Sequence, residues 1–283
     1  MFPRSLKLLR MIGVFPIIDH YYEPMFDPKH LRKPLSAVRT LPAIDWNVAE
    51  QLDLLNSFNF RNEFDNIPTN FVNHTTFYFY NGSYGSGDAD YWYNIIRLKK
   101  PKRIIEIGSG NSTLMARLAI KANQQQDADY ACRHICIEPY EMPWLTQIGV
   151  ELIRKKTEDI DTDFFGMLEA NDILFIDSSH VIRPQGDVLF EYLELLPTLR
   201  QGVIVHIHDI FSPRDYPKDW VEDSVRLWNE QYLLEAFLSF NKEWKVIGAL
   251  NLLCNDYFNL LKSKCSCHLT PDRSPGSFYI QRV

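Results

Sequence analysis

The sequence lacks any run of about 20 apolar residues, so it predicts no membrane-spanning helix. A secretory signal is not predicted either, because Arg4, Lys7 and Arg10 interrupt the apolar stretch at residues 1–18 and no cleavage site of small residues follows. The chain has no excess of positive charge, since its formal net charge is −6. We therefore expect a cytoplasmic protein without a nucleic-acid partner.

Cysteine is scarce, with five residues in a chain of 283. An odd number of cysteines in a chain of this length argues against a disulfide framework. Cys265, Cys267 and His268 form a short metal-ligand motif, but no second ligand pair has the spacing of a zinc finger, so no zinc site is predicted. The hydrophobic fraction of 46% is that of a globular protein with a large core.

From residue 101 onward, short apolar runs alternate with segments of helical periodicity. The apolar runs predict strands at 103–107, 134–138, 150–156, 172–177, 202–208, 244–250 and 276–282. The helical segments predict helices at 89–98 (capped by Asp88), 111–122, 141–148, 186–199 and within 221–240. This alternation is typical of an α/β fold. We predict a Rossmann-like doubly wound sheet that is mostly parallel and ends in an antiparallel C-terminal strand.

Residues 1–87 differ from this pattern. They contain many prolines and aromatic residues and little clean periodicity. We predict that 1–87 form an irregular N-terminal extension that could act as a lid, and that 88–283 form the cofactor-binding domain.

The segment EIGSGNST lies at a predicted strand-to-helix turn. Gly108 and Gly110, with Ser109 between them, would let the backbone approach a ligand closely next to the free amides of a helix start. Thr113 stands where a dinucleotide-binding fingerprint would have its third glycine. Glu106 suits a cationic ligand, such as the ammonium or sulfonium group of S-adenosylmethionine, better than a pyrophosphate. An ordinary glycine-rich turn is the alternative.

Acidic residues also follow the next two predicted strands. Glu138 ends the second strand, where a carboxylate can accept hydrogen bonds from ribose hydroxyl groups. Glu158 and Asp159 follow the third strand and could contact an adenine amino group. A solvated carboxylate at a strand end is the alternative for Glu138.

Four polar residues follow the fourth and fifth predicted strands: Asp177, His180, His208 and Asp209. In an open α/β sheet, ligands bind beyond the carboxyl ends of the strands, so these side chains are expected to converge on an active site. His206 lies one strand period before His208 and is predicted to be a hydrogen-bonded core residue. The alternative for His208 and Asp209 is a pair that braces a loop.

The segments IIEIGSGNST, ICIEP, DILFIDSSH and GVIVHIHDIF together resemble the class I S-adenosylmethionine-dependent methyltransferases over roughly 88–283. FIDSSH followed by GVIVHIHD is similar to the branch that includes macrocin-type sugar O-methyltransferases from polysaccharide and antibiotic clusters. This branch uses a divalent metal held by acids after strands four and five. The chain departs from the branch at His208, where an acid is usual.

The resemblance implies a set of roles for these residues. His180 would be the general base, with His208 as the other candidate. S-adenosylmethionine would contact the predicted loop and strand-end residues Glu106, Gly108, Ser109, Gly110, Glu138, Glu158, Asp159 and Asp177. A divalent cation, Mg²⁺ or another, would be held by Asp177, His208 and Asp209.

We therefore predict methyl transfer from S-adenosylmethionine to a hydroxyl group of a small molecule, a sugar or a glycan. Two alternatives stay open: a nicotinamide-dependent oxidoreductase on a similar sheet, and a non-catalytic cofactor-binding protein. The protein could form a homo-oligomer in any of these three classes. The sequence does not identify the acceptor.

Overall fold

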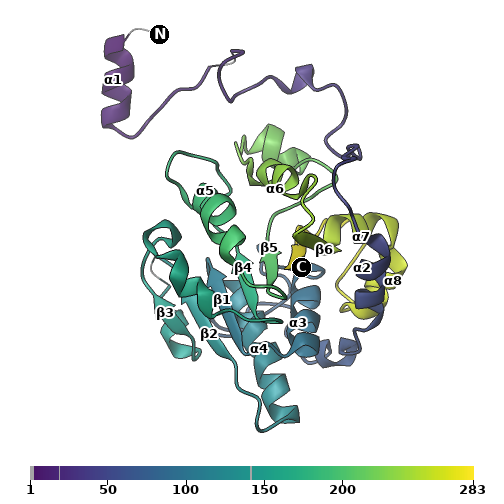
Figure 1. Ribbon diagram of the computed structural model, residues 1–283. Helices are drawn as coiled ribbons and strands as arrows, with labels where there is room; N and C mark the ends of the chain where they lie inside the picture. Colours follow the sequence, from purple (N-terminus) through teal and green to yellow (C-terminus); the bar gives the residue numbers. More distant parts are fainter. Residues whose placement is uncertain (1–2, 19, 141) are drawn as a thin grey trace. The chain divides into compact units, whose positions relative to one another are not determined.

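A computed structural model describes residues 3–18, 20–140 and 142–283 (Figure 1). The chain divides into two compact units. The smaller unit comprises residues up to Ala37 together with Asp215–Leu227, and the larger comprises Val38–Arg214 with Trp228–Val283. In the part of the chain that is described, no helix is both long enough and apolar enough to cross a bilayer.

The larger unit is built on a seven-stranded sheet with the order β3-β2-β1-β4-β5-β7-β6. Its strands are β1 (Arg103–Ile107), β2 (Arg133–Ile137), β3 (Glu151–Ile153), β4 (Ile173–Ile176), β5 (Ile204–Ile207), β6 (Trp244–Ala249) and β7 (Phe278–Arg282). The first five strands pair in parallel, and β7 runs antiparallel to both β5 and β6. The predicted Rossmann-like sheet with an antiparallel C-terminal strand is confirmed.

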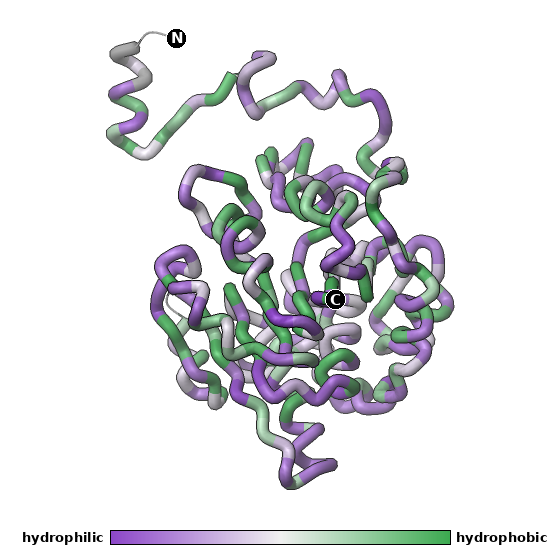
Figure 2. The backbone as a smooth tube through the Cα atoms, viewed as in Figure 1, coloured by the Kyte–Doolittle hydropathy of each residue, from purple (hydrophilic) through white to green (hydrophobic). Residues whose placement is uncertain are grey.

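The central strands are apolar at almost every position because helices and loops cover both faces. Ile104 and Ile105 on β1, Phe175 on β4 and Val205 on β5 are all fully buried. Such continuous apolar runs are typical of parallel strands. In Figure 2, stretches of hydrophobic colour accordingly run along the strands of the sheet.

The helices of the larger unit are α2 (Val48–Asn56), α3 (Asp88–Lys99), α4 (Asn111–Gln126), α5 (Asp187–Leu189), α6 (Glu230–Leu238), α7 (Leu250–Asp256) and α8 (Phe258–Lys264). Of these, α3 and α4 agree with predicted helices, whereas α2, α7 and α8 were not predicted from the sequence. The predicted cap of α3 is wrong, because Asp88 is the first helical residue and its carboxylate accepts the amide of Ser277. The N-cap is Gly87, whose amide donates to Asp90.

Three predicted helices are shorter or more irregular than expected. At 141–148 only a 3₁₀ turn forms at Pro143–Gln147, and Glu141 lies outside the described residues. The segment 186–199 passes from α5 into a π turn and ends in a 3₁₀ turn that contains Pro197, which lacks an amide donor. Within 221–240, a π turn covers Asp219–Asp223, the φ of +48° at Val225 interrupts helical backbone, and α6 begins at Glu230.

Residues 38–87 belong to the same compact unit as the sheet. Gln51 on α2 is fully buried and accepts the amide of Ala249 at 2.7 Å, and Asn47 donates to the carbonyl of Val246 at 3.1 Å. The predicted functional boundary between 87 and 88 stays a prediction, although this compact unit begins at Val38.

The smaller unit contains α1 (Pro3–Met11) and a 3₁₀ turn at Pro28–His30, capped by the side chain of Asp27. The amide of Asp215 donates to the carbonyl of Leu35 (3.1 Å), which joins the two segments of this unit.

Candidate active site

The loop between β1 and α4 begins at Gly108. This residue has a φ of +83°, and a Cβ atom on it would overlap the carbonyl oxygen of Asp177. Its amide donates to the carbonyl of Ile137 at 3.0 Å, and the amide of Asp177 donates to Ile107 at 2.9 Å. Glycine alone satisfies both the backbone angle and the close approach. The ends of β1, β2 and β4 therefore meet tightly at this loop.

The side chain of Glu106 lies beneath the loop and is fully buried. The hydroxyl of Thr113 donates to one of its carboxylate oxygens, and Nε2 of His134 lies 3.1 Å from the other. Thr113 also accepts the amide of Gly110 at 3.1 Å, at the start of α4. The acid predicted to meet a cationic ligand thus holds the glycine loop together. Its direct contact with a cofactor stays a prediction.

A cavity of about 290 Å³ opens at the carboxyl ends of β1, β2 and β4. Its lining includes four residues singled out from the sequence: Gly108, Glu138, Glu158 and Asp177. The four other predicted cofactor-binding residues, Glu106, Ser109, Gly110 and Asp159, lie outside this lining. Asp159 instead lines a neighbouring cavity of about 800 Å³, which shares Glu158 with the first.

The carboxylate of Glu138 is held at the wall of the smaller cavity. Its Oε1 accepts the amide of Tyr140 at 2.9 Å, and its Oε2 accepts the amide of Ser109 at 3.3 Å. Arg154 donates to the backbone carbonyl of Glu138 at 3.1 Å. Each carboxylate oxygen has a second lone pair, so the group could also accept hydrogen bonds from a ligand hydroxyl.

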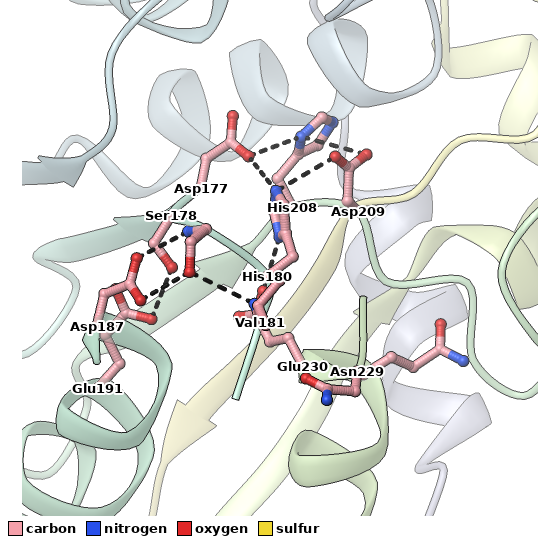
Figure 3. Close-up of polar contacts among 12 residues, drawn as sticks. Asp177, Ser178, His180, Val181, Asp187, Glu191, His208, Asp209, Asn229 and Glu230 are labelled. Carbon is pink, nitrogen blue, oxygen red and sulfur yellow. Dashed lines mark hydrogen bonds and ion pairs between the residues drawn. The ribbon is translucent and has the colours of Figure 1, made fainter. Parts of the chain in front are cut away.

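The structure brings Asp177, His180, His208 and Asp209 together at the ends of β4 and β5 (Figure 3). Nε2 of His180 lies 3.3 Å from Oδ1 of Asp177 and 3.5 Å from Oδ2 of Asp209. Nδ1 of His208 lies 3.5 Å from the same oxygen of Asp177 and 3.6 Å from Oδ1 of Asp209. Asp177 also lines the smaller cavity, so the cluster and the cavity share a wall.

Two residues of the site carried no signal in the sequence. Glu230, the first residue of α6, places Oε2 2.8 Å from Nδ1 of His180. The ring of Trp228 packs on the His180 ring at a centroid distance of 4.2 Å. Both lie far along the chain from His180 and follow no recognisable motif, so sequence reasoning missed them.

The charges within the cluster shift the pKa values of its members. Burial would lower the pKa of His180, but its hydrogen bonds with Asp177 and Glu230 raise it well above the usual range. Burial also opposes protonation of His208, but Asp209 and Asp177 raise its pKa to about 10. Burial would raise the pKa of Asp177, yet His208 and His180 hold it well below its usual value. The neighbouring carboxylates therefore favour the charged form of both imidazoles, while burial opposes it.

The donor atoms of the cluster fit a divalent cation. Among the described residues, ligand atoms of Asp177, His180 and Asp209 all lie within 4.8 Å of one another. Nδ1 of His208 is buried and makes no hydrogen bond, although it faces the same two carboxylates. The metal set expected from the sequence had His208 and not His180, so the structure adds a second candidate imidazole. Two carboxylates and an imidazole are ligands that suit Mn²⁺, Fe²⁺ or Zn²⁺ better than Mg²⁺, because Mg²⁺ prefers oxygen ligands only.

His206 is the core histidine that the strand pattern predicted. It is fully buried, its Nε2 lies 2.9 Å from the hydroxyl of Ser277, and its ring stacks on Tyr279 at 4.1 Å. Burial and the nearby His208 lower the pKa of His206 well below the usual value, so this ring is neutral.

Two comparisons with known proteins include the same region of the chain. Residues 105–210, from within β1 to just beyond β5, match the model of a methyltransferase domain. An uncharacterized protein of Archaeoglobus fulgidus is 30% identical over 185 residues, which cover 60% of this chain and 81% of that protein. The family match supports the predicted methyltransferase, whereas the macrocin-type branch stays a prediction.

Two solved structures of the plantazolicin methyltransferase BpumL are also similar to this chain. One is a complex with SAH, and the other is a complex with a pentazolic desmethylPZN analog and SAH. They are 14% and 15% identical to this chain, with TM-scores of 0.35 and 0.36, and each match covers 69% of this chain and 82% of the other.

Proposed function

Because the chain belongs to the same family as the archaeal relative and contains a methyltransferase domain, we propose that it transfers a methyl group from S-adenosylmethionine to a hydroxyl group of a small molecule or a sugar. One observation carries this proposal. Asp177 lines the cavity beside Glu138 and at the same time contacts both histidines of the cluster. The carboxylate of Asp177 would thus lie between the cofactor site and the histidine that accepts the proton.

S-adenosylmethionine, when bound, supplies a methyl group already activated by its sulfonium charge, so the protein has mainly to position the reactants. Glu138 would accept hydrogen bonds from the ribose hydroxyl groups. Glu158 and Asp159 would lie toward the adenine. Gly108, Ser109 and Gly110 would face the cofactor with backbone atoms only.

His180 would take the proton from the acceptor hydroxyl. Its Nδ1 contacts Glu230, so Nε2, which faces Asp177 and Asp209, is the nitrogen that would take this proton. A histidine base typically contributes about 10²–10⁴-fold to the rate. A divalent metal would be held by Asp177 and Asp209 with His208 or His180, and it would stabilise negative charge on the acceptor oxygen.

The cofactor assignment predicts that Glu138→Ala weakens binding of S-adenosylmethionine at least about tenfold, or 1.4 kcal/mol, in isothermal calorimetry. The reason is the loss of a fixed carboxylate from the cavity wall. Glu151→Ala is the matched control, because Glu151 is an exposed acid on β3 that pairs with Arg133. Tighter binding of NAD than of S-adenosylmethionine would favour the oxidoreductase alternative and overturn the assignment.

Removal of divalent metals with EDTA is expected to lower methyl transfer at least about tenfold. Added Mn²⁺ should restore the rate more fully than Mg²⁺, because an imidazole ligand suits the softer ion. Product mass spectrometry with candidate nucleotide sugars and glycans gives both the rate and the identity of the acceptor. Unchanged activity in EDTA would instead make Asp177 and Asp209 hydrogen-bonding groups for the substrate.

A further inference from the structure

We propose that Glu230 is a positioning residue, which keeps a proton on Nδ1 of His180 and turns Nε2 toward Asp177 and Asp209. The inference rests on the proposed role of His180 at the site. It assigns a function to a residue of α6, an element outside the strand ends that carry the rest of the cluster.

The contacts of the Glu230 carboxylate define which nitrogen of His180 carries the proton. Glu230 is fully buried, and both of its oxygens are used: Oε2 lies 2.8 Å from Nδ1 of His180, and Oε1 accepts the hydroxyl of Tyr192 at 2.9 Å. An ionised carboxylate can only accept hydrogen bonds. The contact of Nδ1 with Glu230 at 2.8 Å is shorter than those of Nε2 with Asp177 and Asp209 at 3.3 and 3.5 Å. We therefore assign Nδ1 as the donor and Nε2 as the nitrogen that gains or loses a proton, or binds a metal.

The backbone of His180 is fixed by the same end of α6. His180 has a φ of +60°, a conformation that costs a residue other than glycine about 1 kcal/mol or more. Its carbonyl accepts the amides of Asn229 at 3.0 Å and Glu230 at 3.2 Å. The side chain of Asn229 in turn accepts the amide of Ile182 at 2.6 Å. The loop after β4 is thus tied to the start of α6 by backbone and side-chain bonds together.

The ring itself is confined from a third side. Trp228 packs on the His180 ring at a centroid distance of 4.2 Å, with 41° between the ring planes. Three consecutive residues, 228 to 230, therefore hold the ring face, the carbonyl and Nδ1 of one histidine. The carbonyl of His180 also satisfies two free amides at the start of α6, but that start does not need the contacts of Trp228 and Glu230 with the imidazole. This convergence is the reason to assign Glu230 to His180 and not to the stability of α6 alone.

The first test is made on the wild-type protein without any substrate. Long-range ¹H–¹⁵N NMR on ¹⁵N-histidine-labelled protein distinguishes the two neutral tautomers, and the signal lost in His180→Ala identifies His180. At a pH where His180 is neutral, we expect its proton on Nδ1. A proton on Nε2 would overturn the proposal. This outcome does not depend on methyl transfer, so it separates failure of the inference from failure of the proposed function.

The second test is kinetic. Glu230→Gln preserves size but removes the charged acceptor, and it should lower kcat at least about 100-fold with unchanged affinity for S-adenosylmethionine. In a His180→Ala background the same change should cost less than about threefold, because it acts through His180. Tyr192→Phe is the matched control, since it removes the other hydrogen bond of the same carboxylate. Equal losses from Glu230→Gln in both backgrounds would overturn the positioning role.

Discussion

Replacing His180 by alanine is expected to lower kcat at least about 100-fold while leaving the affinity for S-adenosylmethionine unchanged. Nε2 of His180 faces Asp177 and Asp209 at 3.3 and 3.5 Å, but His180 is not part of the cavity lining that contains Glu138. Its removal therefore takes away the proton acceptor without altering the proposed cofactor site. Single-turnover kinetics and calorimetry measure the two effects separately.

His208→Ala is the matched comparison, because His208 faces the same two carboxylates at 3.5 and 3.6 Å. Normal turnover in His180→Ala combined with an inactive His208→Ala would move the base role to His208. Metal content distinguishes a base from a ligand. A His180→Ala protein that keeps its metal and loses turnover supports the base. If the His180→Ala variant loses both its metal and its turnover, His180 is a metal ligand instead.

The substitution Gly108→Ala is expected to abolish cofactor binding and to destabilise the fold by at least about 2 kcal/mol. A Cβ at this position would overlap the carbonyl oxygen of Asp177, and the φ of +83° disfavours any side chain. Relief of this overlap would move the loop away from the end of β4. Denaturant unfolding measures the loss of stability, and calorimetry measures the loss of binding.

Gly110→Ala is the control within the same loop. Gly110 has an extended backbone with a φ of 179°, and no atom lies within 4 Å of a Cβ built on it. The variant should therefore keep wild-type stability, and weaker binding in it would indicate close approach of the cofactor to Gly110. Equal destabilisation by both substitutions would contradict the packing argument for Gly108.

The sequence alone was sufficient for the sheet and for the strand ends that carry the cluster. Strands buried on both faces are apolar at most positions, so runs such as the one around Phe175 on β4 were recognisable without any knowledge of their neighbours. Parallel strands point their carboxyl ends to one edge, so Asp177 and His208 could be predicted to lie close together, as they do at 3.5 Å.

Only the tertiary structure decided how those side chains are held. The partners of Glu106 are Thr113 and His134, and the partners of His180 are Glu230 and Trp228. The local periodicity of the sequence does not predict these contacts, because each depends on the position of another strand or helix in the folded chain. The same holds for α6, whose N-cap Asn229 and first residue Glu230 donate their amides to the carbonyl of His180. Residue type and spacing therefore determine which strands end in the polar residues of the cluster, while long-range packing determines which nitrogen of His180 faces the site.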